Sequence, residues 1–182
     1  MQRFFLIAAA LLLMLMSPTV VNAENQPSSM LSSGQLSLIR QNCVAAQALI
    51  TRLHTNDAGA RVYLGQEYET ILAKLMTPMN SRVVVNKYDG SSLIKTAAEF
   101  STKLDSFRST YQKYDEQIKR ILQMKCTDQP VSFLDALTAA RDYRKSARDI
   151  VADLGGLVQQ YRAQVDELKA QISSDQSQSG DQ

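Results

Sequence analysis

Three long segments of the chain carry apolar residues at the spacing of an α-helix that packs along one stripe. The clearest spans residues 93–121, where nine residues follow one another at alternating intervals of four and three: Leu93, Ala97, Phe100, Leu104, Phe107, Tyr111, Tyr114, Ile118 and Ile121. An unbroken heptad pattern of this kind keeps one helix face against a partner helix. The turn-forming residues 89–92 (Asp-Gly-Ser-Ser) precede it, so we predict a helix that begins there.

A later segment, which follows Pro130, repeats the pattern at alternating intervals of three and four. Its ten positions are Leu137, Ala140, Arg144, Ala147, Val151, Leu154, Val158, Tyr161, Val165 and Leu168. Proline is well tolerated in the first turn of a helix, so we predict a helix from about residue 130. Arg144 is the one charged residue on this otherwise apolar line.

The first segment, residues 36–76, is less regular. Its predicted seam is Leu36, Ile39, Cys43, Ala46, Ile50, Leu53, Asp57, Ala60, Leu64, Glu67 and Ile71, which places two acidic residues on the apolar line. We expect one long helix to about Met76, with a division at Asn56-Asp57 as the alternative. Thr77-Pro78 then stops or kinks this helix, and residues 79–88 form either a helical turn or an extended linker.

Three long helices joined by short connections run antiparallel to one another. We therefore predict an all-α fold, an elongated antiparallel three-helix bundle with coiled-coil-like heptad seams, in a single domain of residues 34–172. An open rod is the alternative, and because a heptad seam also pairs between chains, a homo-oligomer is possible.

The chain opens with the pattern of an export signal. Met-Gln-Arg precedes an apolar run at residues 4–16, and Pro18 and Val21-Asn22-Ala23 follow it, the order typical of a signal peptide. A bilayer span needs about 20 apolar residues, so an uncleaved anchor is the less favoured alternative. We expect a signal at residues 1–23, a flexible lead-in at 24–33, a disordered polar tail at 173–182, and a secreted or periplasmic protein with no membrane span after signal removal.

The chain has two cysteines, Cys43 and Cys126. In an oxidising compartment an even number of cysteines indicates a disulfide. Cys43 lies near the start of the first predicted helix and Cys126 at the end of the second, so antiparallel packing brings them to the same end. We predict that they are bonded, with two buried thiols as the alternative.

The predicted disulfide fixes the heights of residues along the bundle. Residues at one level on the first two helices then have numbers that sum to about 169, and third-helix numbers run about 87 above first-helix numbers. This rule brings Asp57 level with Arg144 and close to Tyr111, within about one helical turn. We predict a buried polar layer of these three residues that fixes the register of the helices. The rule also places Gly155 near Tyr68, and we expect Gly155-Gly156 to make room for that ring, with a hinge as the alternative.

The net charge and the lack of catalytic and metal-binding motifs exclude several classes of function. Without the signal the chain has 19 basic and 18 acidic residues, which gives no concentrated basic face for nucleic acid. The single histidine, His54, lacks the further ligands that zinc requires, and no nucleophile elbow, phosphate loop, HExxH or calcium-loop motif occurs. We expect a protein that is not an enzyme, has no catalytic or metal site, and binds no cofactor or nucleic acid.

The break at Pro78 suggests a contact surface. Met76 and Met79 flank the proline and, with Val83, Val84 and Val85, are predicted to form a small exposed apolar tip. We expect a non-enzymatic structural or protein-interaction bundle of the envelope or extracellular space, which contacts an as yet unknown protein or envelope component. The alternative is a periplasmic chaperone-like holdase that binds apolar clients.

Several short stretches carry a resemblance to a group of known sequences. They are Leu53-His54-Thr55-Asn56-Asp57-Ala58, Arg61-Val62, Gly65, Tyr68-Glu69, the run from Leu75 to Arg82, Phe107-Arg108, Tyr111, Tyr114, Cys126 and Pro130. With these residues the chain resembles uncharacterised exported helical proteins of candidate-phylum bacteria such as Saccharibacteria, over most of residues 43–169. The resemblance implies a bacterial secreted protein and no catalytic residue.

Overall fold

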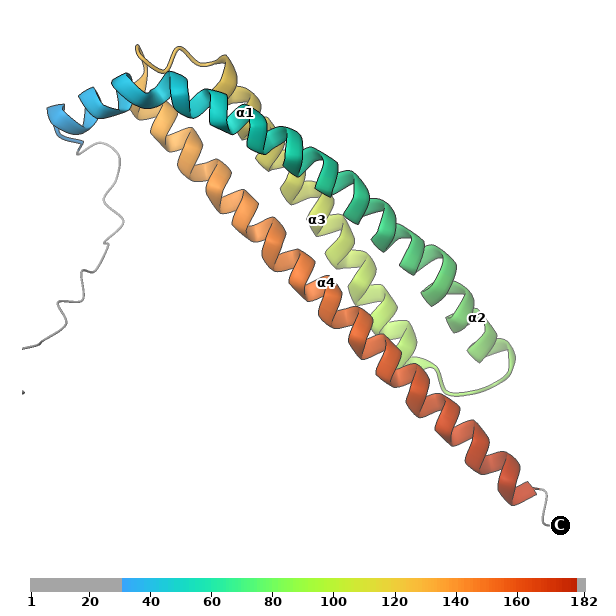
Figure 1. The fold of residues 1–182 in the computed structure, drawn as a ribbon. Coiled ribbons are helices and arrows are strands. Elements are labelled where there is room, and N and C mark those ends of the chain that lie inside the picture. Colours follow the sequence, from blue (N-terminus) through green and yellow to red (C-terminus); the bar gives the residue numbers. More distant parts are fainter. Residues whose placement is uncertain (1–30, 180–182) are drawn as a thin grey trace, which may run out of the picture. The chain divides into compact units, whose positions relative to one another are not determined.

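A computed structural model describes residues 31–179, with side chains to residue 174. These residues form helical segments and no strand: α1 (Ser33–Thr70), η2 (Ile71–Met76), α2 (Thr77–Val85), α3 (Ser91–Gln123) and α4 (Pro130–Ser179). In Figure 1, α1, η2 and α2 make one continuous rod beside α3 and α4. The predicted all-α three-helix bundle is confirmed. The predicted signal and all but the last three residues of the predicted lead-in lie outside the described residues.

The seams predicted for α3 and α4 form the core. All nine predicted positions of α3 are buried, and Thr96 is buried with them. Among the ten predicted positions of α4, buried ones alternate with half-buried ones, and the buried ones are Ala140, Ala147, Leu154, Tyr161 and Leu168. These two helices pack along each other more extensively than either packs against α1, so α3 and α4 form the base on which α1 lies.

The first helical rod does not end near Met76 as expected but continues through Pro78, so of the two expected effects of Thr77-Pro78, a stop or a kink, the stop is wrong. The segment η2 before the proline is a π-helical turn, in which the Thr77 N–H reaches back five residues to the Leu72 carbonyl. The Thr77 hydroxyl donates to the same oxygen at 2.9 Å. Proline clashes with the carbonyl four residues earlier in an α-helix, and the wider π turn relieves that clash. The chain therefore stays helical to Val85.

The structure also decides whether the first segment is one helix or two, and it moves the end of the last helix. α1 passes through Asn56-Asp57 without a break, so this segment is one helix. α4 continues beyond the predicted boundary at residue 172 to Ser179. The hydroxyls of Ser173 and Ser174 donate to the carbonyls of Lys169 and Gln171 at 3.0 and 2.7 Å. Residues 180–182 of the predicted disordered tail lie outside the described residues.

The buried side chains form two apolar clusters along the helices. One cluster contains Cys43, Ile50, Tyr111, Tyr114, Ile118, Ile121, Cys126, Phe133, Ala136 and Ala140. The other contains Tyr68, Met76, Val83, Leu93, Ala97, Phe100, Leu104, Phe107, Ala147, Leu154, Tyr161 and Leu168. The predicted disulfide joins Cys43 to Cys126 in the first cluster. In the part of the chain that the structure describes, no helix is both long and apolar enough to cross a membrane.

Candidate functional site

The inward face of α1 matches the seam predicted from the sequence only in part. Leu53, Ala60 and Glu67 of the predicted seam are exposed. The residues that face α3 and α4 lie at alternating intervals of four and three: Cys43, Gln47, Ile50, His54, Asp57, Arg61, Leu64 and Tyr68. Half of these residues are polar, and each polar residue contacts α3 or α4. Cys43, Ile50, Asp57 and Leu64 of this face belong to the predicted seam, whereas its other four residues were not predicted.

Gln47 is the first polar residue of this inward face. Its amide nitrogen donates to the carbonyls of Ile121 and Met124 at 2.7 and 2.9 Å. Carbonyls in the last turn of a helix have no partner within the helix. Gln47 thus ties α1 to the end of α3 close to the disulfide.

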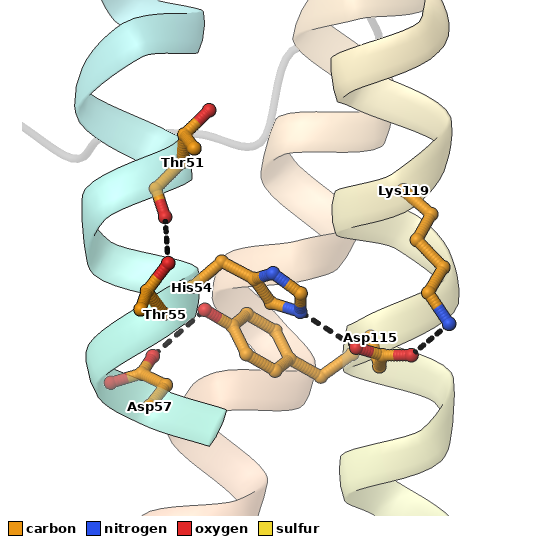
Figure 2. Close-up of polar contacts among 7 residues, drawn as sticks. Thr51, His54, Thr55, Asp57, Asp115 and Lys119 are labelled. Atoms are coloured by element: carbon orange, nitrogen blue, oxygen red, sulfur yellow. Dashed lines mark hydrogen bonds and ion pairs between the residues drawn. The ribbon is translucent and has the colours of Figure 1, made fainter. Parts of the chain in front are cut away.

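His54 forms the second polar contact of the inward face. Figure 2 shows its ring reaching from α1 to Asp115 of α3, with 2.6 Å between Nε2 and Oδ1. Lys119 contacts the other oxygen of Asp115 at 2.6 Å. The Lys119 hydrogen bond, assisted by His54, outweighs burial and lowers the pKa of Asp115. Among the described residues no group of three histidine, cysteine or acidic side chains is close enough together to hold a metal ion.

The third contact is the ion pair between Asp57 and Arg144. The Arg144 Nε and Nη2 atoms donate to the two carboxylate oxygens at 2.6 and 3.0 Å. Burial alone raises the pKa of Asp57, but the hydrogen bonds from Arg144 and Tyr114 outweigh it, and the pKa lies below its ordinary value. The side chains of Asp57 and Arg144 are 19% and 36% exposed. The sequence predicted a buried layer, and the structure shows one that is half-buried.

The phenol of this layer is Tyr114, not Tyr111. The Tyr114 hydroxyl donates to Asp57 Oδ2 at 2.8 Å, and this bond together with burial raises the pKa of Tyr114. Tyr111 instead lies under the Arg61 guanidinium, whose carbon is 5.0 Å from the ring centre. The Tyr111 hydroxyl is buried and has no hydrogen-bond partner among the described residues.

A cavity of about 180 Å³ adjoins the ion pair. It lies between α1, α3 and α4, where the two apolar clusters meet. Its apolar wall consists of Ala60, Leu64, Phe107, Ala147 and Val151, and its polar and charged lining residues are Asp57, Arg61, Tyr111, Tyr114, Arg144 and Arg148. The arrangement can accommodate a small molecule.

The predicted contact tip is largely buried, which corrects a second expectation. Met76 and Val83 are only 2% and 4% exposed, and Met79 is half-buried. Because η2 and α2 continue the rod, Met76 and Val83 lie seven residues apart on the face that meets the core. Only Val84 and Val85 remain exposed.

A larger exposed apolar surface lies on α1 and was missed by the sequence prediction. Eight uncharged residues, all exposed, follow one another at intervals of three or four: Leu38, Asn42, Ala45, Leu49, Leu53, Asn56, Ala60 and Tyr63. We call this set the outer stripe. It extends over about 37 Å of helix. A second line of uncharged residues at helical spacing is visible in the sequence, but only the position of the true seam shows that it faces outward.

Comparison of the chain with protein-family models, with curated proteins and with solved structures finds no match in any of the three.

Proposed function

We propose that the protein is an exported, non-enzymatic interaction protein of the envelope or extracellular space, and that its outer stripe binds a second copy of the chain. The observation that carries the proposal is the outer stripe itself, which exposes Leu38, Leu49, Leu53 and Tyr63 without any charge among them. An exposed, uncharged and largely apolar line of this length on a helix is typical of a protein contact.

A second copy fits because seven of the eight residues of the outer stripe, from Leu38 to Ala60, are self-complementary about Leu49. Asn42 and Asn56 lie seven residues before and after Leu49, Ala45 and Leu53 four residues before and after it, and Leu38 and Ala60 eleven residues before and after it. In a two-fold symmetric antiparallel pair of α1 helices, each Asn42 would face the partner's Asn56. Amide side chains both donate and accept hydrogen bonds, and the other pairs join a larger apolar residue to alanine.

The disulfide supports the exported part of the proposal. Disulfides persist mainly outside the cytoplasm, and Cys43 and Cys126 are bonded.

The self-association is tested by light scattering of the purified protein over a range of concentrations. Leu49→Glu places two like charges face to face at the symmetry axis, and we expect this variant to be monomeric where the parent is dimeric. Val44→Glu is the matched control, because Val44 is 64% exposed and Leu49 66%, on the same helix but about 140° apart around it. A monomeric parent, or equal effects of the two substitutions, would contradict the proposal.

The antiparallel register has its own test. Asn42→Glu alone should weaken the dimer, because it buries an unpaired charge. Adding Asn56→Lys should restore the dimer, since each glutamate then faces the partner's lysine. In a parallel pair each glutamate would face a glutamate, and the double variant would not be restored.

A holdase is the second candidate, favoured by apolar residues outside the outer stripe. Val44 and Val62 are exposed on another side of α1, and Val84 and Val85 at the end of α2. A holdase should suppress aggregation of a chemically unfolded client, and Val44→Glu should impair it as much as Leu49→Glu does. Dimerisation without suppression of aggregation would favour the interaction protein.

A further inference from the structure

The cavity beside the Asp57–Arg144 pair has the size and wall of a small-molecule site. Its volume of about 180 Å³ slightly exceeds the roughly 150 Å³ of an engineered apolar cavity that binds benzene. The side chains of Leu64, Phe107 and Val151 supply an apolar wall. A molecule with one ring or a chain of about six carbon atoms therefore matches the space.

The charges around the cavity favour an anion. Three arginines, Arg61, Arg144 and Arg148, line it together with one carboxylate, Asp57. Arg144 already neutralises Asp57 through two hydrogen bonds. Neither Arg61 nor Arg148 has an ion-pair partner within the part of the chain that the structure describes. Two positive charges thus remain available at the cavity.

Tyr111 supplies an independent observation that points to a ligand. Its side chain lines the cavity and is only 7% exposed, yet its hydroxyl has no hydrogen-bond partner among the described groups. A buried hydroxyl without a partner destabilises the folded protein. The Arg61 guanidinium over its ring belongs to an exposed, flexible side chain, which can move to admit an acceptor.

We propose that this cavity binds a small organic monocarboxylate with an apolar body. The carboxylate pairs with Arg148 and Arg61 and accepts a hydrogen bond from the Tyr111 hydroxyl, and the apolar body lies against Leu64, Phe107 and Val151. Arginine suits this role because its guanidinium donates in the fork geometry that a carboxylate accepts. Asp57 and Arg144 hold α1 in place at the edge of the cavity.

Isothermal titration calorimetry of the purified protein with hexanoate and with hexanol tests the proposal. Hexanol has a chain of the same length but no charge, and we expect it to bind at least tenfold more weakly. Tyr111→Phe and Arg148→Gln should each weaken hexanoate binding about tenfold, the effect of one hydrogen bond to a charged group. Arg141→Gln is the matched control, since Arg141 is exposed on α4 and does not line the cavity.

A substitution that fills the cavity provides the second measurement. Ala147→Leu adds apolar volume at the wall and should abolish hexanoate binding while circular dichroism shows an intact helical fold. Leu49→Glu should bind hexanoate like the parent, so the site and the proposed dimer can fail separately. Equal affinity for hexanoate and hexanol, no saturable binding of hexanoate, or full affinity in Tyr111→Phe and Arg148→Gln would overturn the proposal.

Discussion

Asp57 is held from two directions, by Arg144 of α4 and by Tyr114 of α3. Removing a carboxylate and a guanidinium from water costs about as much as their attraction returns, so such a pair adds little net stability. Its loss is asymmetric, however. When one partner is removed, the remaining half-buried charge still pays the free energy of desolvation but no longer gains the attraction of the opposite charge.

This asymmetry gives a prediction for three variants. Arg144→Met should lower the free energy of unfolding by about 1–3 kcal/mol, because Asp57 then lacks its charged partner. Asp57→Leu/Arg144→Met should stay within about 1 kcal/mol of the parent, since neither charge remains. Urea unfolding followed by circular dichroism measures both. Equal stability of the single and the double variant would contradict the ion pair's role.

The same pair predicts how stability depends on pH. Because the folded protein holds the pKa of Asp57 below its ordinary value of 3.8, the pair's contribution is complete above that pH and is lost as the pH falls through the lower, folded value. Arg144→Met should therefore lose less stability between pH 5 and pH 3 than the parent does, in the same unfolding assay. An identical pH dependence of the two proteins would count against this assignment.

Part of this residue-scale arrangement could be predicted from sequence. Every residue of an α-helix adds the same rise, so the register set by the disulfide fixes which residues lie at the same level along the bundle. Residue numbers alone therefore placed Asp57 level with Arg144. The same arithmetic has a tolerance of about one turn, and Tyr111 and Tyr114 lie within one turn of each other. Only the direction of each side chain distinguishes them, and that depends on packing between helices.

At the scale of the element, the prediction worked best where a helix is simply amphipathic. α3 separates apolar from polar residues cleanly, so its seam could be found by periodicity. α1 has polar residues at half of its inward positions and apolar residues on its outer face. Hydrophobic periodicity finds such a seam only in part, because Gln47, His54 and Arg61 are satisfied by partners on other helices that are distant in sequence.

The glycines of the helical rods give a prediction at this scale. Gly155 and Gly156 were expected to make room for Tyr68, but an added Cβ at either position would meet no atom within 4 Å. Gly155→Ala and Gly156→Ala should therefore each stabilise the protein by about 1 kcal/mol, the helix propensity difference. The shift of the urea unfolding midpoint measures the gain. A loss of stability in either variant would show that the glycine has a packing role.

Gly90 is the opposite case and serves as the contrast. A Cβ there would lie 2.7 Å from Cγ1 of Val83, which is buried. Gly90→Ala should therefore destabilise the protein in the assay that records a gain for the α4 glycines.

At the scale of the whole molecule, the disulfide links α1 to the end of α3 across 83 positions of sequence. α1 packs less extensively on α3 and α4 than they pack on each other. The topology was predictable because long helices and short connections leave few arrangements, and the cysteines fixed which ends meet.

Reduction should accordingly lower the free energy of unfolding by about 4 kcal/mol in the chain-entropy account of a loop this long. Thermal unfolding with and without a thiol reductant measures the loss. Cys43→Ala/Cys126→Ala should melt at the same temperature as the reduced parent, and adding the reductant should not change that temperature. An unchanged melting temperature, in parent protein whose thiols are shown to be free, would contradict a stabilising bond.

The position of the same disulfide also determines how the chain would transmit mechanical tension. A pull applied at the two ends of the described segment passes from Cys43 directly to Cys126 and then along α4. Most of α1, together with η2, α2 and α3, lies outside this line of force. Under load the oxidised chain would therefore lengthen only by unfolding the residues before Cys43 and after Cys126. Reducing the disulfide would release roughly 280 Å of additional contour length.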